Sequence, residues 1–505
     1  MRFLYSLSFL LWFTVAIGCD KNEGIAKIEV ESVSFDKNSL ELTEGETASL
    51  KTTVLPANAN DKKLSWSSSD NKVASVNVFA VITAVSEGTA TITATAPNGV
   101  KAQCVVTINK IDLPDFSFLK AQGNKLVNEE GEQIMLRGTN LGCWLVQEDW
   151  MTGNTSGCQK EMIETLNERF GEETTEELID VWEETWIKES DLDNIKNLGF
   201  NCVRVPFSFM NLLRLDDYSW KADAFERLDW VVQQCSEREI YVILDMHGAP
   251  GSQNGSDHSG IDGGNNKEAA SEFFFGDNAL DNQAKFYEIW ETIATRYAGN
   301  EAVAGYDLLN EPFCTYRYSS TVGESALHAL LFPIYDEAYK RIRAKDPDHL
   351  IIMEATWDPW DLPNPSTYGW KNVMYQYHNY EYSDYDNANG KQISSMRNKL
   401  NHIKNYDANY KVPNLMGEFC YMNNYDAWRE GMALLNSYGV HWTSWNYKVQ
   451  KYYGNWGIYN CTTSNINIKT ATESAIRAAW GGITTTKNTS LADVLSEYAS
   501  GKTTF

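Results

Sequence analysis

Several patterns that define common protein classes are missing from this sequence of 505 residues. Its nine cysteines form no CxxC pair and no closely repeated spacing, so they indicate neither a zinc site nor a disulfide framework. The seven histidines show no HExxH spacing. In residues 116–482, which form the larger of two predicted domains, no Gly-rich phosphate-binding fingerprint follows the first predicted strand. We therefore expect no metal and no other cofactor.

Positive charge is also scarce. The chain has 43 Lys and Arg against 68 Asp and Glu, a net charge of −25, which disfavours phosphate backbones and anionic membranes as partners. We expect no nucleic-acid partner, whereas a neutral polymer is compatible with this charge. Aromatic residues are plentiful, with 17 Trp and 26 Tyr; core packing accounts for most of them, and exposed rings suit the faces of sugars.

A sustained apolar run occurs at the N-terminus. Residues 1–18 carry Arg2, an apolar stretch through Phe9–Phe13 and small residues before Cys19. The run is short for a membrane span of about 20 residues and is typical of an export signal. Its end resembles a bacterial lipoprotein cleavage site, which would make Cys19 the lipidated first residue of the mature protein. We expect an exported protein whose lipid anchor alone contacts the bacterial outer membrane, on its periplasmic or outer face. The alternative is an ordinary secreted protein.

Residues 28–108 have a different composition, rich in Ser, Thr, Val and Ala. Alternating apolar positions and turn signals at Pro56–Asn60 and Pro97–Gly99 predict a small all-β sandwich. The segments Leu64–Asp70, Val73–Val76 and Gly88–Ala94 resemble the bacterial immunoglobulin-like group 2 family. A spacer is favoured over a glycan-binding module, because the segment with Trp66 is the one in which that family buries its tryptophan.

Residues 116–482 alternate strand-like apolar runs with amphipathic stretches. A chain of 505 residues is too long for a single hydrophobic core, so this segment is expected to be a domain of its own. Its eight apolar runs fit a closed (β/α)8 TIM barrel of the α/β class better than an open sheet. Residues 483–505 are expected to be a C-terminal tail. The predicted strands are Ile134–Leu136, Cys202–Val205, Ile240–Asp245, Val303–Leu309, Leu350–Met353, Val373–Tyr377, Leu415–Gly417 and His441–Trp445.

Polar and aromatic residues gather at or just beyond the predicted strand ends. The carboxyl ends of the strands form the active site in such barrels, so these residues are the candidate site. Singly, each has a structural interpretation: a capped turn, a buried histidine or a paired arginine. Together they are harder to explain in that way. They are Arg204, His247, Asn310, Glu311, His378, Tyr380, Glu418 and Trp445.

Seven motifs surround these residues: Arg137–Gly142, Asn201–Pro206, Asp245–Gly248, Asn310–Pro312, His378–Tyr380, Gly417–Phe419 and Trp445. In this combination and order the large domain resembles glycoside hydrolase family 5, retaining β-glycosidases with a (β/α)8 fold. The resemblance implies that Glu311 is the general acid/base and Glu418 the nucleophile. The charge of Glu418 should then keep a proton on Glu311 until Glu418 carries the sugar.

The resemblance also implies substrate-binding roles for the remaining candidates. We expect Arg204 and Tyr380 to hydrogen-bond Glu418, and Asn310 to hold the sugar 2-hydroxyl. The further expected roles are those of His247 and His378, which would orient hydroxyls or Glu311, and of Trp445, which would form the floor under the sugar.

The loop His247–Gly255 resembles the exo-β-1,3-glucanase-like branch of the family. Long loops at Ser252–Phe275 and Trp357–Trp370 either close a pocket or only cover the barrel rim. Three functions follow: retaining hydrolysis of a β-linked glucan or oligosaccharide; a β-glucosidase or glycosylceramidase with an apolar groove beside Trp357 and Trp360; and a noncatalytic glycan-binding lipoprotein. Both glutamates are present, which argues against the third.

The lipoprotein interpretation makes a direct prediction. Cells expressing the full chain and fed radiolabelled fatty acid should incorporate label into the protein, and Cys19→Ser should remove it because the acyl acceptor is lost. Cys104→Ser, in the predicted sandwich, is the matched control and should keep the label. Label that persists in Cys19→Ser would contradict the interpretation.

Overall fold

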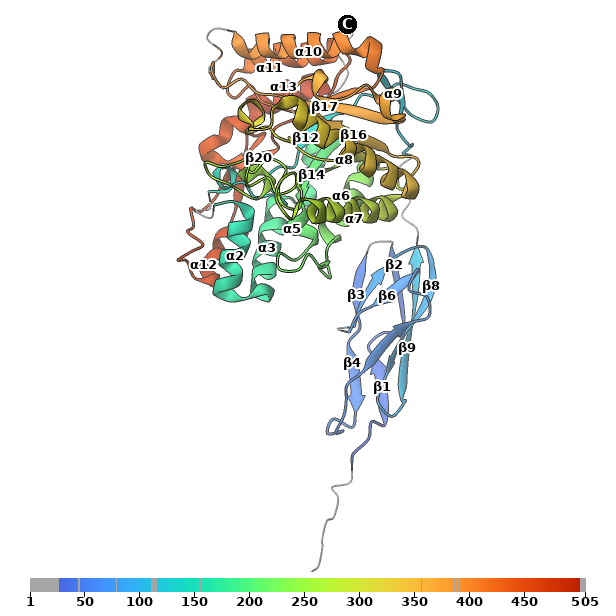
Figure 1. The fold of residues 1–505 in the computed structure, drawn as a ribbon. Coiled ribbons are helices and arrows are strands. Elements are labelled where there is room, and N and C mark those ends of the chain that lie inside the picture. Colours follow the sequence, from blue (N-terminus) through green and yellow to red (C-terminus); the bar gives the residue numbers. More distant parts are fainter. Residues whose placement is uncertain are drawn as a thin grey trace, which may run out of the picture. The chain divides into compact units, whose positions relative to one another are not determined.

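The computed structural model describes residues 27–43, 46–78, 80–109, 116–153, 157–355, 357–385, 387 and 390–499 (Figure 1). The chain divides into two compact units, Met1–Asp112 and Leu113–Phe505. The expected signal peptide and Cys19 lie outside the described residues. Among the described residues, no helix is both long and apolar enough to cross a membrane.

The N-terminal unit is built from strands, which confirms the all-β expectation. The sheets follow the orders β2-β9-β8-β5, β3-β7-β6 and β1-β4. Along β9, buried and exposed residues alternate because successive side chains point to opposite faces of a sheet. Trp66 is half-buried and stacks on Phe35 at 5.5 Å between ring centroids. The strands are β1 (Ser32–Phe35), β2 (Ser39–Thr43), β3 (Thr47–Ser49), β4 (Thr52–Leu55), β5 (Ser65–Ser68), β6 (Ala74–Val76), β7 (Val81–Ala84), β8 (Gly88–Thr95) and β9 (Lys101–Asn109).

The second unit holds a closed barrel in the order β12-β13-β14-β15-β16-β17-β18-β19, and all neighbouring strands are parallel. This confirms the (β/α)8 fold. Buried residues fill β13 to β19, which explains their near-continuous apolar runs. The barrel strands are β12 (Arg137–Asn140), β13 (Cys202–Ser208), β14 (Tyr241–Gly248), β15 (Val303–Asp307), β16 (Leu350–Glu354), β17 (Val373–Asn379), β18 (Asn414–Phe419) and β19 (His441–Ser444).

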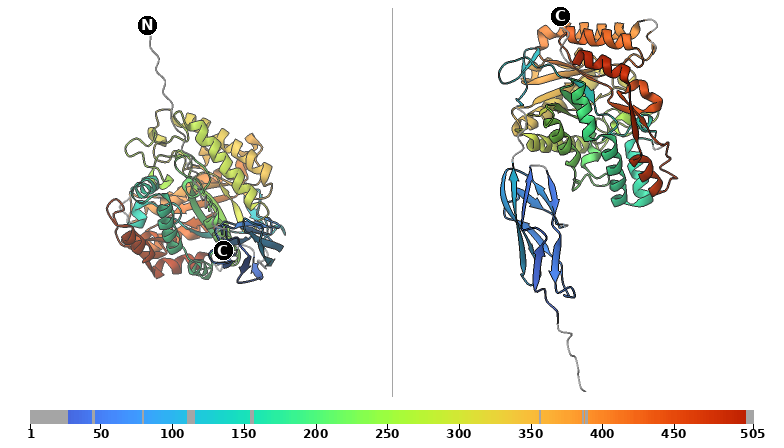
Figure 2. Two further views of the ribbon diagram at one scale, coloured as in Figure 1. Left: turned by 90° about the horizontal axis from the view of Figure 1, so that it is seen from below. Right: turned by 180° about the vertical axis from the view of Figure 1, so that it is seen from behind.

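Helices and short helical turns surround the barrel, as the two further views in Figure 2 show. They are α1 (Asp149–Thr152), α2 (Gln159–Phe170), α3 (Glu172–Trp186), α4 (Glu189–Asn197), α5 (Phe209–Leu212), α6 (Glu226–Ser236), η1 (Asp257–Ser259), α7 (Ala279–Tyr297), η2 (Arg317–Ser319), α8 (Glu324–Lys345), η3 (Pro359–Asp361), α9 (Pro365–Tyr368), α10 (Lys391–Tyr410), α11 (Tyr425–Ser437), η4 (Lys451–Trp456), α12 (Glu473–Gly481) and α13 (Thr489–Ala499). Small additional strands are β10 (Lys120–Gln122), β11 (Lys125–Val127), β20 (Lys448–Gln450), β21 (Tyr459–Thr462) and β22 (Thr484–Lys487).

The first barrel strand lies later in the chain than predicted. The apolar run Ile134–Leu136 precedes β12, and Leu136 packs in a small cluster with Leu119 and Leu126. The strand itself is polar because its side chains bond the barrel backbone: Thr139 Oγ1 donates to the carbonyl oxygen of Ser444 (3.2 Å), and Asn140 Nδ2 donates to that of Gly417 (2.9 Å).

Residues 483–505 are not simply a tail, because their described part contains β22 and α13. β22 pairs with β21, and α13 packs against α11 (Figure 2). Leu491, Val494 and Leu495 of α13 are buried. Arg137 of β12 donates to the carbonyl oxygens of Tyr498 (3.2 Å) and Ala499 (3.3 Å). The second compact unit therefore extends beyond residue 482, because an apolar face of α13 is buried in it.

Candidate active site

A cavity of about 540 Å³ lies at the carboxyl ends of the barrel strands. Six of the eight sequence-predicted site residues line it: His247, Asn310, Glu311, Tyr380, Glu418 and Trp445. Arg204 and His378 are fully buried beneath this layer, against Glu418 and Glu311. The cavity wall also contains Trp357, which the second functional candidate placed beside an apolar groove. The remaining lining residues were not singled out by the sequence: Glu148, Trp150, Asp257, His258, Cys314, Thr315, Tyr382, Tyr385, Tyr453 and Trp456.

Arg204, on β13, joins most of the strand ends through one buried guanidinium. It contacts four carboxylates and two amide oxygens, which give every nitrogen at least one partner. These are Asp307 Oδ2 (2.8 Å from Nε), Glu418 Oε1 (2.8 Å from Nη1), Asn140 Oδ1 (3.1 Å from Nη1), Asn310 Oδ1 (2.8 Å from Nη2), Asp245 Oδ1 (3.0 Å from Nη2) and Glu354 Oε2 (3.7 Å from Nη2).

Glu418 lies near the end of β18, and both of its oxygens have partners. Arg204 donates to Oε1, and the hydroxyl of Tyr380 donates to Oε2 at 2.9 Å. The two expected contacts are therefore present. Burial raises the pKa of Tyr380 well above its ordinary value, and the charge of Glu418 raises it further, so the phenol stays a donor.

Glu311 follows β15 on a loop and has a φ of 44°, in the left-handed region that a non-glycine residue seldom adopts. His378 Nδ1 lies 2.7 Å from its Oε1, and His258 Nε2 lies 3.3 Å from its Oε2. Burial would raise the pKa of Glu311, but the hydrogen bond and charge of His378 and the charge of His258 lower it below its ordinary value. This direction is opposite to the expected effect of Glu418, whose charge should keep a proton on Glu311, because two imidazoles favour the ionised form of Glu311.

His378, at the end of β17, connects the two glutamates. Its Nδ1, which contacts Glu311 Oε1, lies 3.5 Å from Oε2 of Glu418. One ring nitrogen therefore faces both carboxylates. On the other side of the ring, Nε2 lies 3.5 Å from Glu354 Oε1, which fixes the ring from below.

His247 does not contact Glu311 among the interactions described. Its Nδ1 lies 2.7 Å from Asp245 Oδ2, and its Nε2 lies 3.3 Å from Asn310 Nδ2. Burial lowers the pKa of His247 to about 3, so the ring is neutral at ordinary pH. Its face stacks on Trp445, with ring centroids 5.6 Å apart and planes at 11°.

Trp445 follows β19 and sits against the motif that begins at Arg137. A Cβ on Gly142 would meet Trp445 Cη2 at 2.9 Å and Asn446 Nδ2 at 2.9 Å, so only glycine lets the backbone approach this closely. The loops after β14 and β15 are joined by Gln253, whose Nε2 donates to the carbonyl oxygens of His247 and Asn310, both at 2.7 Å.

The buried carboxyls around Arg204 exceed the positive charge available to them. Burial raises the pKa of Asp245 to about 7 and that of Glu354 well above its ordinary range, although Arg204 opposes both shifts. Burial therefore favours the neutral form of Glu354, which would reduce the negative charge beneath the two glutamates.

The residues that the sequence missed lie mainly on loops. Glu148 follows β12 and accepts a hydrogen bond from Trp150 Nε1 at 2.8 Å; His258 and Asp257 belong to the expected loop Ser252–Phe275, and Trp357 begins the second expected loop. No period or spacing marks a loop residue as part of a cavity. The loop that resembles the exo-glucanase branch was the available signal, and it stopped short of His258. Each of the eight cysteines in the described residues is free.

A closed parallel barrel with two carboxylates in an aromatic-lined cavity defines the class: this is the arrangement of a glycoside hydrolase. Residues 146–451 match the family described as cellulase (glycosyl hydrolase family 5), and residues 29–106 match the bacterial Ig-like domain (group 2). The chain therefore belongs to glycoside hydrolase family 5 and carries an Ig-like domain.

Curated relatives include a beta-xylosidase of Phanerodontia chrysosporium, 30% identical over 58% of this chain and 58% of that protein, and a glucan 1,3-beta-glucosidase of Candida oleophila, 29% identical over 49% and 59%. The chain thus spans somewhat over half the length of the curated relatives it matches. An endogalactoceramidase structure shares the fold, with a TM-score of 0.54, 17% identity and coverage of 75% of this chain and 84% of that one. A rutinosidase from Aspergillus niger has a TM-score of 0.50, 15% identity and coverage of 69% and 98%.

Glu148 gives a testable dependence of stability on pH. Burial raises its pKa to about 8, and the charge of Asp257 adds to the shift. The unfolded chain loses this proton near the ordinary pKa of about 4.3, so the folded state binds more protons between these values. This contribution to the free energy of unfolding is present at low pH and falls as pH rises through that range.

Urea unfolding of the barrel between about pH 5 and 8 tests this. Glu148→Gln mimics the neutral acid and should lose less stability on raising the pH than the wild type does. Glu129→Gln, at an exposed position, is the matched control and should follow the wild type. Parallel curves for Glu148→Gln and wild type would contradict the shift.

Proposed function

We propose that the protein hydrolyses β-glycosidic bonds of a β-linked glucan with retention of configuration, by double displacement. Glu418 acts as the nucleophile, and Glu311 acts as the general acid and then the general base. The observation that carries this proposal is the single nitrogen of His378 that faces both carboxylates, at 2.7 Å from Glu311 and 3.5 Å from Glu418.

That nitrogen limits the separation of the glutamates. The two oxygens cannot lie farther apart than the sum of their distances to His378 Nδ1, and this sum is below the roughly 6.5 Å at which the carboxyl spacing of inverting glycosidases begins. Retaining enzymes need about 5–5.5 Å, since one carboxylate attacks the anomeric carbon directly. The geometry supports retention.

In the first step, Glu418 Oε1 or Oε2 bonds to the anomeric carbon while the bond to the leaving oxygen breaks and that oxygen takes a proton. Arg204 and Tyr380 each donate a hydrogen bond to one oxygen of Glu418 and so hold the carboxylate in place before attack. We propose that this proton comes from Glu311, although the hydrogen bond and charge of His378 and the charge of His258 lower the pKa of that carboxyl. Glu311 Oε2, on the side of His258, is the oxygen free of the contact with His378.

In the second step, Glu418 has lost its charge to the ester with the sugar. Glu311 accepts a proton from water, which attacks the anomeric carbon and releases Glu418. We propose that Asn310 holds the sugar 2-hydroxyl, that the neutral His247 orients a neighbouring hydroxyl, and that Trp445 forms the floor. Their positions at the cavity support these roles.

A β-glucan is the substrate we favour, because several curated relatives are glucan 1,3-beta-glucosidases. A β-glucosidase or glycosylceramidase acting on a small glucoside or glycolipid is the second candidate. Trp357 lines the cavity, as that candidate requires, whereas Trp360 packs with its ring 5.0 Å from His402. Membership of an enzyme family with both glutamates at the cavity argues against the noncatalytic glycan-binding alternative.

We also propose that the protein is exported and held at the bacterial outer membrane by a lipid on Cys19. The N-terminal pattern supports this, and the Ig-like domain between anchor and enzyme would serve as a spacer. A surface or periplasmic site suits an enzyme whose polymer substrate cannot cross a membrane.

The roles of the two glutamates can be separated. Glu311→Ala should lower turnover of an unactivated β-glucoside by about 10²–10⁴-fold, the usual contribution of a general acid–base group, and affect an aryl glucoside with a good leaving group less in the first step. Glu418→Ala should abolish turnover of both, because no nucleophile remains. Proton NMR of the first wild-type product should show retained configuration.

Added azide distinguishes lost chemistry from damaged folding. Azide should restore turnover of Glu311→Ala, and the product should be a glycosyl azide of retained configuration. It should also restore turnover of Glu418→Ala, and there the product should be a glycosyl azide of inverted configuration. Glu430→Ala, on the surface of α11, is the control and should behave as wild type. Inverted configuration of the wild-type product, or full turnover by Glu418→Ala, would contradict the roles assigned to the two glutamates.

The substrate is tested by product profiles on β-1,3-, β-1,4- and β-1,6-glucans, aryl β-glucosides and a glucosylceramide. We expect the highest kcat/KM on a β-glucan, with monosaccharide as the released product. A ladder of oligosaccharides would rule out attack at chain ends, and a preference for glucosylceramide would favour the second candidate.

A further inference from the structure

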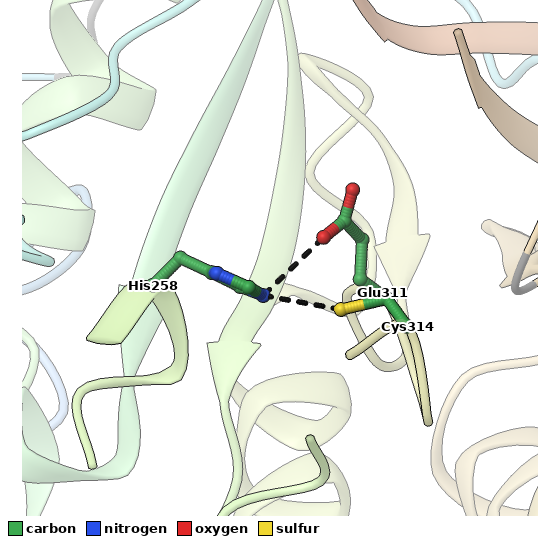
Figure 3. A group of neighbouring side chains, drawn as sticks. All are labelled: His258, Glu311 and Cys314. Atoms are coloured by element: carbon green, nitrogen blue, oxygen red, sulfur yellow. Dashed lines mark hydrogen bonds and ion pairs between the residues drawn. The ribbon is translucent and has the colours of Figure 1, made fainter. Parts of the chain in front are cut away.

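His258, Glu311 and Cys314 converge on one point in the cavity wall (Figure 3). His258 Nε2 lies 3.3 Å from Glu311 Oε2 and 3.4 Å from Cys314 Sγ. These are an imidazole, a carboxylate and a thiol from two different loops: η1 carries the first, and the loop after β15 carries the other two. The role proposed for Glu311 gives the thiol of Cys314 no function, although Cys314 contacts His258 beside the carboxylate, so this grouping needs another explanation.

The three donor atoms have the chemistry and spacing of a zinc site. Zn²⁺ binds histidine nitrogen at about 2.0–2.1 Å, carboxylate oxygen at similar distance and cysteine sulfur at about 2.3 Å, in tetrahedral geometry. These bond lengths place ligand nitrogen and oxygen about 3.4 Å apart, and nitrogen and sulfur about 3.6 Å apart. The observed distances, 3.3 and 3.4 Å, agree with both within the tolerance expected of a metal site.

The surroundings also fit an ion. All three residues line the cavity, so an ion can enter from it and keep a water molecule as fourth ligand. His258 Nδ1 lies 3.8 Å from Asp257 Oδ1, where a carboxylate can orient the ring from behind. Asn254 Nδ2, 2.8 Å from His258 Nε2, would give up this contact on binding and keep its bond to the carbonyl oxygen of Glu311 at 3.2 Å.

We propose that His258, Glu311 and Cys314 form a binding site for Zn²⁺, and that occupation of this site inhibits the enzyme. The Cys314 thiol and the charged imidazole of His258 each release a proton to solvent as sulfur and Nε2 bond the metal, and Glu311 Oε2 supplies the third bond. The metal then occupies the glutamate oxygen that faces away from His378. Glu311 can no longer pass a proton through that oxygen to the leaving group.

Two other clusters of possible ligands among the described residues are poorer candidates. Glu311, Glu354 and His378 also lie close together, but Glu354 and His378 are completely buried and Glu354 already faces Arg204. Glu324, His328 and Asp361 form the third group, and Arg317 pairs with both of its carboxylates. A guanidinium beside each carboxylate opposes a second cation.

Binding is tested on the full metal-free chain, without reference to activity. Titrated Co²⁺ should bind one equivalent and produce a thiolate-to-cobalt charge-transfer band with the intense visible absorption of a tetrahedral centre; Zn²⁺ should displace it. Cys314→Ser should remove the band and weaken Zn²⁺ binding by at least about 10–100-fold, since loss of even an outer partner has that effect. His258→Gln should also weaken binding. His328→Gln is the matched control and should bind as wild type.

The inhibition rests on the proposed role of Glu311 and is measured separately. Zn²⁺ should inhibit wild type and His328→Gln reversibly, with EDTA restoring activity, and the half-inhibitory concentration should rise at least about tenfold in Cys314→Ser, each variant being compared with its own metal-free activity. Absence of the cobalt band in wild type, or its persistence in Cys314→Ser, would overturn the site. Zn²⁺ binding at this site without inhibition would overturn the inhibitory part alone, whereas an inactive protein with an intact band would overturn the proposed function instead.

Discussion

The buried guanidinium of Arg204 is the interaction on which the site depends. It bonds the carboxylates of Asp307 and Glu418 and the amide oxygens of Asn140 and Asn310, and so ties together side chains from β12, β13, β15 and β18. A buried charge is costly unless it is paired and hydrogen-bonded. Arg204 meets that condition through its planar fork, which lysine could not reproduce.

The same interaction sets the charge of the whole centre. One guanidinium cannot neutralise every buried carboxyl near it, and burial therefore raises the pKa of Glu354 well above its ordinary range. Glu418 lies 2.8 Å from the guanidinium, as Asp307 does, and also receives a hydrogen bond from Tyr380. The proposed nucleophile is thus the carboxylate that the guanidinium and a phenol hold together at the cavity.

The sequence predicted those features of the fold and the site that follow from hydrophobic periodicity and from short motifs. Seven barrel strands were predicted because strands covered on both faces form continuous apolar runs. The eight site residues were predicted because they lie at or just beyond the ends of these runs, where the active site of a barrel is found. β12 was misplaced because Thr139 and Asn140 bond the backbone inside the barrel and interrupt the apolar signal. α13 was taken for part of a tail, although Leu491 and Leu495 are buried against the barrel.

The errors at the site have a different cause. Glu148, Asp257, His258 and Cys314 reach the cavity on loops, and loop residues that meet only in three dimensions leave no spacing in the sequence. The protonation of Glu311 was misjudged for the same reason: its pKa depends on His258, which comes from another loop. A motif identifies the carboxylate, whereas its neighbours determine its charge.

The two glutamates are therefore positioned by different parts of the fold. Glu418 is held by Arg204 of a strand and by Tyr380 just beyond one, positions that the closed barrel fixes. Glu311 lies on a loop with a φ of 44° and faces another loop through His258. Since barrel strands are rigid and their loops vary, the fold determines the environment of the nucleophile, and the loop sequence determines that of the acid/base. A change in the loop sequence can therefore alter which leaving group Glu311 protonates, and which cation binds beside Glu311. Such a change leaves the buried network of Arg204 intact.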